Sequence, residues 1–167
     1  MAKLFMLALL TASMGLAAAP LAAADNLDVH GKPVPGKRII TMAAVEPKGG
    51  TTVDKEPFPQ AALPGGGYVL KKPDASGRWE ISTYRWEPSQ VIVNQGDEVT
   101  LEIIGINGDE HPGVIEGYGV SFVVKRGQLS RVTFKADKAG VFRILCDKHH
   151  PSMHGELIVL SARSASR

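Results

Sequence analysis

The sequence contains one cysteine, Cys146, in 167 residues, so it cannot form an internal disulfide bond. Basic and acidic residues nearly balance, at 19 and 17, and no basic run or ladder of aromatic residues indicates nucleic-acid binding. Beyond the N-terminal segment, no stretch approaches the roughly 18 apolar residues of a spanning helix. These shortages exclude a disulfide-stapled scaffold and argue against a nucleic-acid-binding or membrane-spanning protein.

The first 24 residues have the pattern of a secretory signal peptide. Lys3 supplies a short basic start, residues 4–10 an apolar core, and residues 22–24, all alanine, a cleavage site before Asp25. The apolar core is short and no stop-transfer pattern follows it, which argues against a membrane anchor. We therefore expect an exported, periplasmic chain with 18 basic and 17 acidic residues after removal of the signal.

Residues 25–77 lack a regular pattern. They hold seven of the eleven prolines and the run of glycines at 65–67. Such a composition predicts an irregular N-terminal arm, in which only residues 38–45 have the character of a short strand. His30 lies in this arm, and we expect it to be a solvated histidine rather than a metal ligand.

From residue 78 to 163 the pattern is that of a β domain. Short segments of alternating or β-branched residues recur at intervals of roughly 8–12 residues, separated by turn sequences. The expected strands are 79–86, 90–94, 98–106, 120–125, 129–135, 141–145 and 155–160. Residues 111–119 are expected to form a loop, and no long amphipathic helix is apparent. The sequence thus predicts an all-β fold, a Greek-key β-sandwich with an irregular N-terminal arm.

The run from Cys146 to Leu157 concentrates residues that bind soft metals. It holds the only cysteine, three of the five histidines (His149, His150 and His154) and Met153. A thiolate, two imidazoles and a weak axial thioether form the ligand set of blue-copper electron-transfer sites. An exported thiol without a ligand is open to oxidation, which further favours metal binding. We therefore expect a copper site in this run.

The same run resembles a known family. Cys146 followed by His-Pro-Ser-Met-His-Gly at 150–155 is similar to the copper loop of cupredoxins, in which a Met commonly stands two residues before a Gly. The likeness extends back to about Arg78. It is nearest to the copper domain of cytochrome c oxidase subunit II and nitrous-oxide reductase, which has a His after an acidic turn, here His111, and the hairpin pattern found at 132–140. The binuclear centre of that domain needs two cysteines, so the resemblance implies the fold together with a mononuclear centre.

Nitrosocyanin, a red copper protein with one Cys and two His on this loop, is also similar through the same hairpin. Its upstream ligand is a Glu, and that position falls at His111 in this chain, with Glu110 beside it.

The resemblance implies His111, Cys146, His150 and Met153 as the metal ligands. His150 is followed by Pro and precedes Met153 by three residues, whereas His149 follows Cys146 by three, so His149 remains the alternative loop ligand. Neighbouring residues of a strand point to opposite faces, so Met153 and His154 should not both face the metal. Binding by His154 would give Cys plus three His, a set that also suits zinc.

Three functions fit these residues. The favoured one is one-electron transfer between Cu(I) and Cu(II) with transient redox-protein partners. The second is a copper carrier or assembly factor for a respiratory oxidase, with a copper acceptor as partner. The third is catalysis at a red-copper site, with Glu110 or Glu116 as a base. We expect an electron carrier or copper-binding protein more than an enzyme, and the oligomeric state is left open.

Overall fold

The structure, a computed structural model, describes residues 34–161. The expected signal peptide and His30 lie outside these residues. In the described range all the regular elements are β-strands, and no helix there has the length and apolar character to cross a membrane. The all-β prediction is confirmed.

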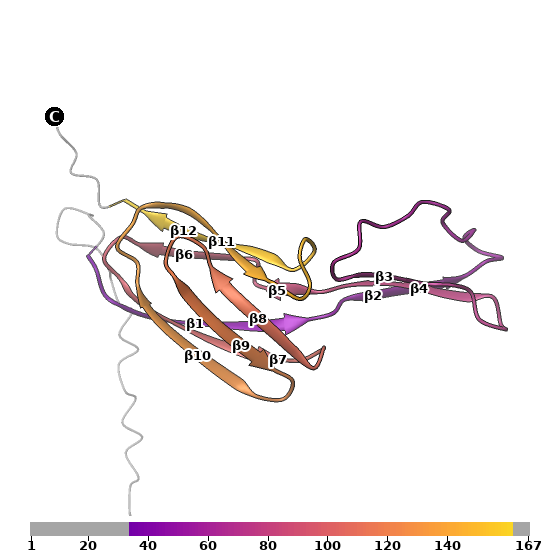
Figure 1. Cartoon of the computed structure of the whole chain (residues 1–167), viewed down its shortest axis with the longest axis horizontal. Helices are drawn as coiled ribbons and strands as arrows, with labels where there is room; N and C mark the ends of the chain where they lie inside the picture. Colours follow the sequence, from indigo (N-terminus) through magenta and orange to yellow (C-terminus); the bar gives the residue numbers. More distant parts are fainter. Residues whose placement is uncertain (1–33, 162–167) are drawn as a thin grey trace, which may run out of the picture.

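The strands form a sandwich of two sheets and a smaller third sheet that projects from one end (Figure 1). The first sheet has the order β10 (Leu129–Lys135), β7 (Glu98–Gly105), β1 (Lys37–Val45), β5 (Arg85–Glu87). The second has the order β6 (Gln90–Asn94), β12 (His154–Leu160), β11 (Gly140–Cys146), β8 (Glu110–Ile115), β9 (Val120–Lys125). Strands remote in sequence pair in both sheets, as expected of a Greek key.

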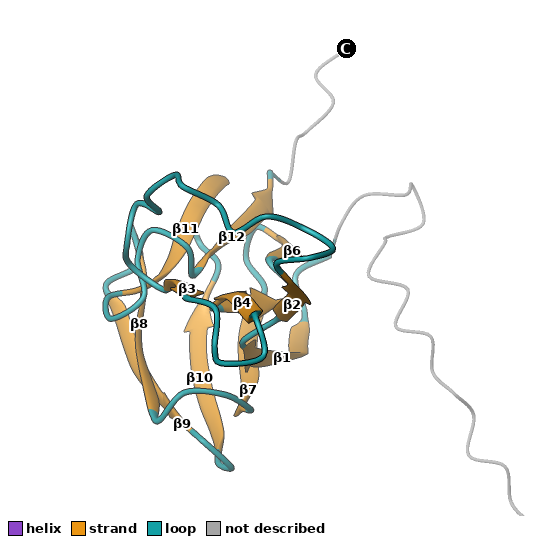
Figure 2. Ribbon diagram, turned by 90° about the vertical axis from the view of Figure 1, so that its right-hand side faces the viewer, coloured by secondary structure: helices purple, strands orange, loops and turns teal. Residues whose placement is uncertain are grey.

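The third sheet has the order β2 (Lys48–Thr52), β4 (Arg78–Thr83), β3 (Tyr68–Lys71). We call residues 48–83, which include these strands and their connections, the extension. Figure 2 looks along the long axis of the molecule, with the extension towards the viewer.

The core lies between the two larger sheets. In β7 the alternating residues Val99, Leu101 and Ile103 are fully buried, while the intervening residues are partly exposed. Trp86, the largest of the fully buried side chains, packs in the same core. Period-two alternation therefore sets which face of each strand is buried, as the sequence predicts.

Parts of the described chain are more regular than expected. Within the arm, β2 and β3 are strands where the sequence predicts an irregular segment, and the expected strand at 38–45 is β1, which pairs in parallel with β7 from Lys37↔Glu98 to Ala44↔Gly105 and lies inside the first sheet. The sandwich therefore begins well before residue 78. The expected loop at 111–119 is also partly a strand, β8, which pairs with both β9 and β11.

The start of β1 is fixed to the turn between β6 and β7 by Asp97. Its side chain is fully buried and accepts hydrogen bonds from the backbone N–H groups of Gly36 (2.7 Å) and Asn94 (2.8 Å). It also forms an ion pair with Arg38, at 3.1 Å. A buried carboxylate that loses its hydrogen-bond donors destabilises the folded state, and so do buried donors that lose their acceptor. Asp97 and its donors therefore depend on one another.

Substitution of Asp97→Ala should lower the free energy of unfolding by about 2–4 kcal/mol, because it leaves two backbone N–H groups and a guanidinium without their acceptor. Urea unfolding of the apo-protein measures this. The control is Asp137→Ala at an exposed carboxylate, which we expect to have little effect. Equal small losses in the two variants would contradict the role given to Asp97.

Candidate metal centre

His111, Cys146 and His149 meet at one end of the sandwich. Their donor atoms all lie within 4.8 Å of one another. The two Nδ1 atoms are 3.2 Å apart, and Cys146 Sγ lies 3.5 Å from His149 Nδ1 and 4.0 Å from His111 Nδ1. His111 and Cys146 are fully buried and His149 is half-buried.

Strand pairing produces this convergence. β11 is antiparallel to β8, with Cys146 opposite Gly113. His111 lies two residues from Gly113 on the same strand, so it projects from the same face as Cys146. The chain then turns after Cys146, and backbone hydrogen bonds from His149 N to Cys146 O (3.2 Å) and from Met153 N to His149 O (3.0 Å) bring His149 back over the cysteine.

The spacing of the donors fits a metal ion. An ion held about 2.0–2.1 Å from nitrogen and 2.3 Å from sulfur requires donor atoms roughly 3.3–4 Å apart. The three separations come close to this range before any ion is added. One thiol and two imidazoles are also a soft donor set that suits copper.

The orientation of His111 is fixed by its other ring nitrogen. Nε2 lies 2.6 Å from the carbonyl oxygen of Asn107. A carbonyl only accepts, so Nε2 carries the proton and Nδ1 presents its lone pair to the site. Gly108 lies directly against the ring: it has φ +76°, and a Cβ there would be 2.8 Å from Nε2.

Burial also favours the metal-binding form of the imidazoles. Desolvation lowers the pKa of His111 and of His149, and the charge of His111 lowers that of His149 further. Burial thus disfavours the charged imidazolium forms, and the neutral imidazole is the form that binds metals. Burial raises the pKa of the Cys146 thiol, so a metal ion that binds here must displace its proton.

Aromatic side chains enclose the site. Tyr84 stacks on His149, with ring centroids 4.1 Å apart and planes at 27°, and lies 5.4 Å from His111. Trp86 meets His111 edge-on at 6.1 Å. The alternation in 79–86 predicts a strand here but does not reveal this contact, because it forms between segments far apart in the sequence.

The structure brings together two of the four expected ligands, His111 and Cys146. Met153 is fully buried at the end of the same loop, and its carbonyl accepts a hydrogen bond from Cys146 N. His150 is exposed and is not in the cluster; His149, the alternative, takes that place. The preference for His150 therefore differs from the arrangement in the structure, while metal ligation itself stays a prediction.

The remaining candidates lie outside the cluster. His154 is exposed, with Nδ1 3.0 Å from the carbonyl of Pro151, so Met153 and His154 do point to opposite sides. Glu116 forms an ion pair with Arg143. Glu110 is in β8, and its carboxylate is not among the three grouped donors.

Comparison with known proteins gives the same fold. Residues 71–159, just over half of the chain, match the family described as Cupredoxin-like domain. The nitrous-oxide reductase of Stutzerimonas stutzeri is 38% identical over 72 residues, which are 41% of this chain and 11% of that protein. The nitrous-oxide reductase of Pseudomonas fluorescens is 34% identical over 73 residues, 42% and 11% of the two chains. The match thus covers about a tenth of each of these curated relatives.

Among solved structures, the Cu-containing nitrite reductase from Thermus scotoductus SA-01 superimposes with a TM-score of 0.50 at 15% identity, over 78% of this chain and 29% of that chain. This likeness supports the fold alone. The matches to nitrous-oxide reductases confirm the resemblance to the copper-domain family that the sequence shows.

Substitution of Gly108→Ala should destabilise the protein by crowding the ring of His111 while leaving all three donor residues in place. A residue with a side chain at positive φ costs about 1 kcal/mol, and the collision with His111 should add roughly 1–3 kcal/mol of overpacking. Gly127→Ala is the matched control, since Gly127 has φ +71° and open space around its Cβ position. Urea unfolding measures both, and equal losses would show that Gly108 does not support the ring.

Proposed function

The chain belongs to the cupredoxin-like domain family, and on that premise we propose that it binds one copper ion and transfers single electrons. His111, Cys146 and His149 are the proposed strong ligands. The observation that carries the proposal is the convergence of their three donor atoms within 4.8 Å in a largely buried space. Bound copper would supply a centre that alternates between Cu(I) and Cu(II).

Met153 is the proposed fourth, weak ligand. Its side chain is fully buried, and its backbone is hydrogen-bonded to Cys146 and His149 on either side of the loop. A thioether suits the axial position of a copper site. The exposure of His154 supports this choice over the alternative of three histidines.

The protein residues do three things for electron transfer. The Asn107 carbonyl keeps His111 in one tautomer. The β8–β11 pairing fixes the distance between His111 and Cys146, and burial keeps water from the thiolate. Ligands held by a rigid scaffold need to move little when the metal changes its charge, which suits rapid exchange of an electron.

The single cysteine supports one copper ion per chain. The binuclear centre of the domain that this chain resembles needs two. With one thiolate available, a mononuclear centre is the arrangement that we propose.

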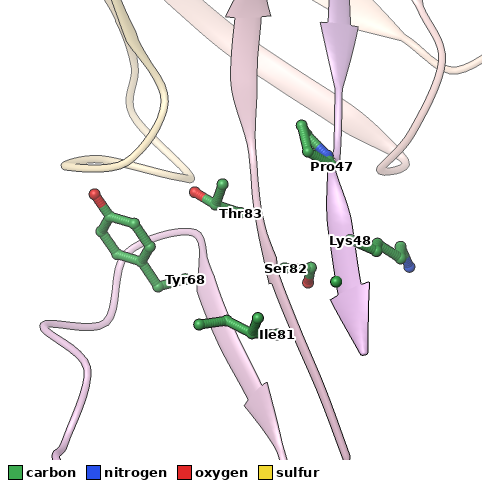
Figure 3. A pocket seen from close by; sticks show the side chains of 7 residues that line it. Pro47, Lys48, Tyr68, Ile81, Ser82 and Thr83 are labelled. Atoms are coloured by element: carbon green, nitrogen blue, oxygen red, sulfur yellow. The ribbon is translucent and has the colours of Figure 1, made fainter. Parts of the chain in front are cut away.

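A carrier fits better than an enzyme. A hollow of about 410 Å³ at the base of the extension contains none of the three donors among its lining residues (Figure 3). The metal-ligand cluster found in residues 34–161 includes no carboxylate that would serve as a base. This hollow therefore offers no substrate site at the donor atoms.

Copper delivery is the second candidate, and one observation favours it. His150 and His154, both exposed, line a surface hollow of about 250 Å³ with Pro151, beside the ligand loop. Imidazoles next to a copper site are suited to passing the ion to an acceptor by ligand exchange.

The proposed location is the periplasm, and its support is the signal-like pattern of residues 1–24. A redox protein that docks transiently through a small interface is the proposed partner.

Absorption and EPR spectra of the Cu(II)-loaded mature protein test the ligand set. The wild type should show an intense thiolate-to-copper band, and Cys146→Ser should abolish it because the thiolate is lost. His149→Ala should alter the spectrum strongly, whereas the neighbouring His150→Ala should leave it unchanged. If His150→Ala altered the spectrum and His149→Ala did not, the assignment of His149 would be wrong. An unchanged spectrum in Cys146→Ser would overturn the site.

A further inference from the structure

The extension contacts the ligand loop through Gly66 and Gly67. The backbone N–H of Ser152, in the loop, donates to the carbonyl of Gly66 at 3.2 Å. The N–H of Tyr84 donates to the carbonyl of Gly67, also at 3.2 Å. These two neighbouring carbonyls therefore join the loop that carries His149 to the residue whose ring stacks on His149.

The contact leaves no room for a side chain. A Cβ at Gly66 would lie 1.8 Å from the carbonyl oxygen of His150, and one at Gly67 would lie 2.2 Å from Ser152 Oγ and 2.7 Å from the carbonyl oxygen of His149. Both glycines have positive φ, +54° and +85°. Gly65 also has positive φ, +76°, but nothing lies within 4 Å of its Cβ position. Close approach to the loop is thus specific to Gly66 and Gly67.

The contacts converge on His149. Ser152 Oγ donates to the carbonyl of His149 at 3.1 Å, so the residue bound by Gly66 also holds the backbone of His149. Tyr84, bound by Gly67, covers the imidazole at 4.1 Å. His149 is held from its backbone side and its ring side by residues that the extension anchors.

We propose that Gly66 and Gly67 form a clamp that positions His149 and retains the bound copper. The inference rests on the proposed function, because it takes copper as the ion. His149 is the donor carried by the loop, whereas His111 and Cys146 are in strands. Release of the metal through the loop therefore requires the loop to lift, and the clamp opposes that movement. The extension contributes no metal ligand. Through the clamp it makes the chain a protein that keeps its copper rather than one that delivers it to an acceptor.

Gly66→Ala and Gly65→Ala, in the full mature chain, test the clamp. The two variants share the strain of a non-glycine residue at positive φ, but only the first collides with the loop. We expect Gly66→Ala to change the Cu(II) spectrum and, after the copper is reduced to Cu(I) with ascorbate, to release it to an excess Cu(I) chelator about tenfold faster or more than wild type. Gly65→Ala should keep the wild-type spectrum and a release rate within about twofold of wild type. A folded Gly66→Ala protein with wild-type spectrum and release rate would overturn the proposal.

Amide hydrogen exchange on the metal-free protein separates this proposal from the copper assignment. The Ser152 amide should be protected in wild type and in Gly65→Ala, and should exchange about tenfold faster or more in Gly66→Ala, because its acceptor is displaced. An unprotected Ser152 amide in wild type would overturn the clamp even if Gly66→Ala proved too unstable to load. A protected amide in a wild-type protein that shows no thiolate-to-copper band would refute the copper function and leave the clamp standing.

Discussion

The pairing register of β8 and β11 is the constraint on which the centre depends. With Cys146 opposite Gly113, His111 and Cys146 project from one face near the end of the sheet. A slip of one residue would turn every side chain of one strand to the other face and separate the imidazole from the thiol. The register is in turn supported by the buried faces of the neighbouring strands, so the core that stabilises the sandwich also sets the donor distances. The same contacts therefore serve the stability of the fold and the arrangement of the three donor residues.

The sequence predicts those features that leave a local pattern. The alternation in residues 98–106 predicts β7, and the turn sequence before it is the one that Asp97 closes. Cys146 is identifiable because it is unique and is followed by His and Met. In contrast, the pairing of β1 with β7 leaves no local pattern in the sequence, because the two strands are about 60 residues apart. The prolines and glycines that follow β1 also obscure its place in the sheet.

The choice between His149 and His150 illustrates a second limit. The two are adjacent, and motif spacing does not separate them. The separation comes from loop hydrogen bonds, chiefly Met153 N to His149 O, which curl the chain so that one imidazole faces the thiol and the next faces solvent. The same holds for Gly66 and Gly67: a glycine run predicts an irregular segment, but the partner that requires the glycines is more than 80 residues away in the chain.

Glycines are concentrated around this centre. Besides Gly66, Gly67 and Gly108, a Cβ at Gly113 would lie 2.4 Å from the ring of Phe122, and one at Gly155 would lie 2.7 Å from the carbonyl oxygen of Ser89. Any amino-acid substitution at these glycines adds a Cβ that would collide with backbone or ring atoms. The proposed metal centre thus depends on positions that bear no donor, and substitutions at these codons should be poorly tolerated. The candidate metal site is shaped as much by these glycines as by the three residues that carry its donor atoms.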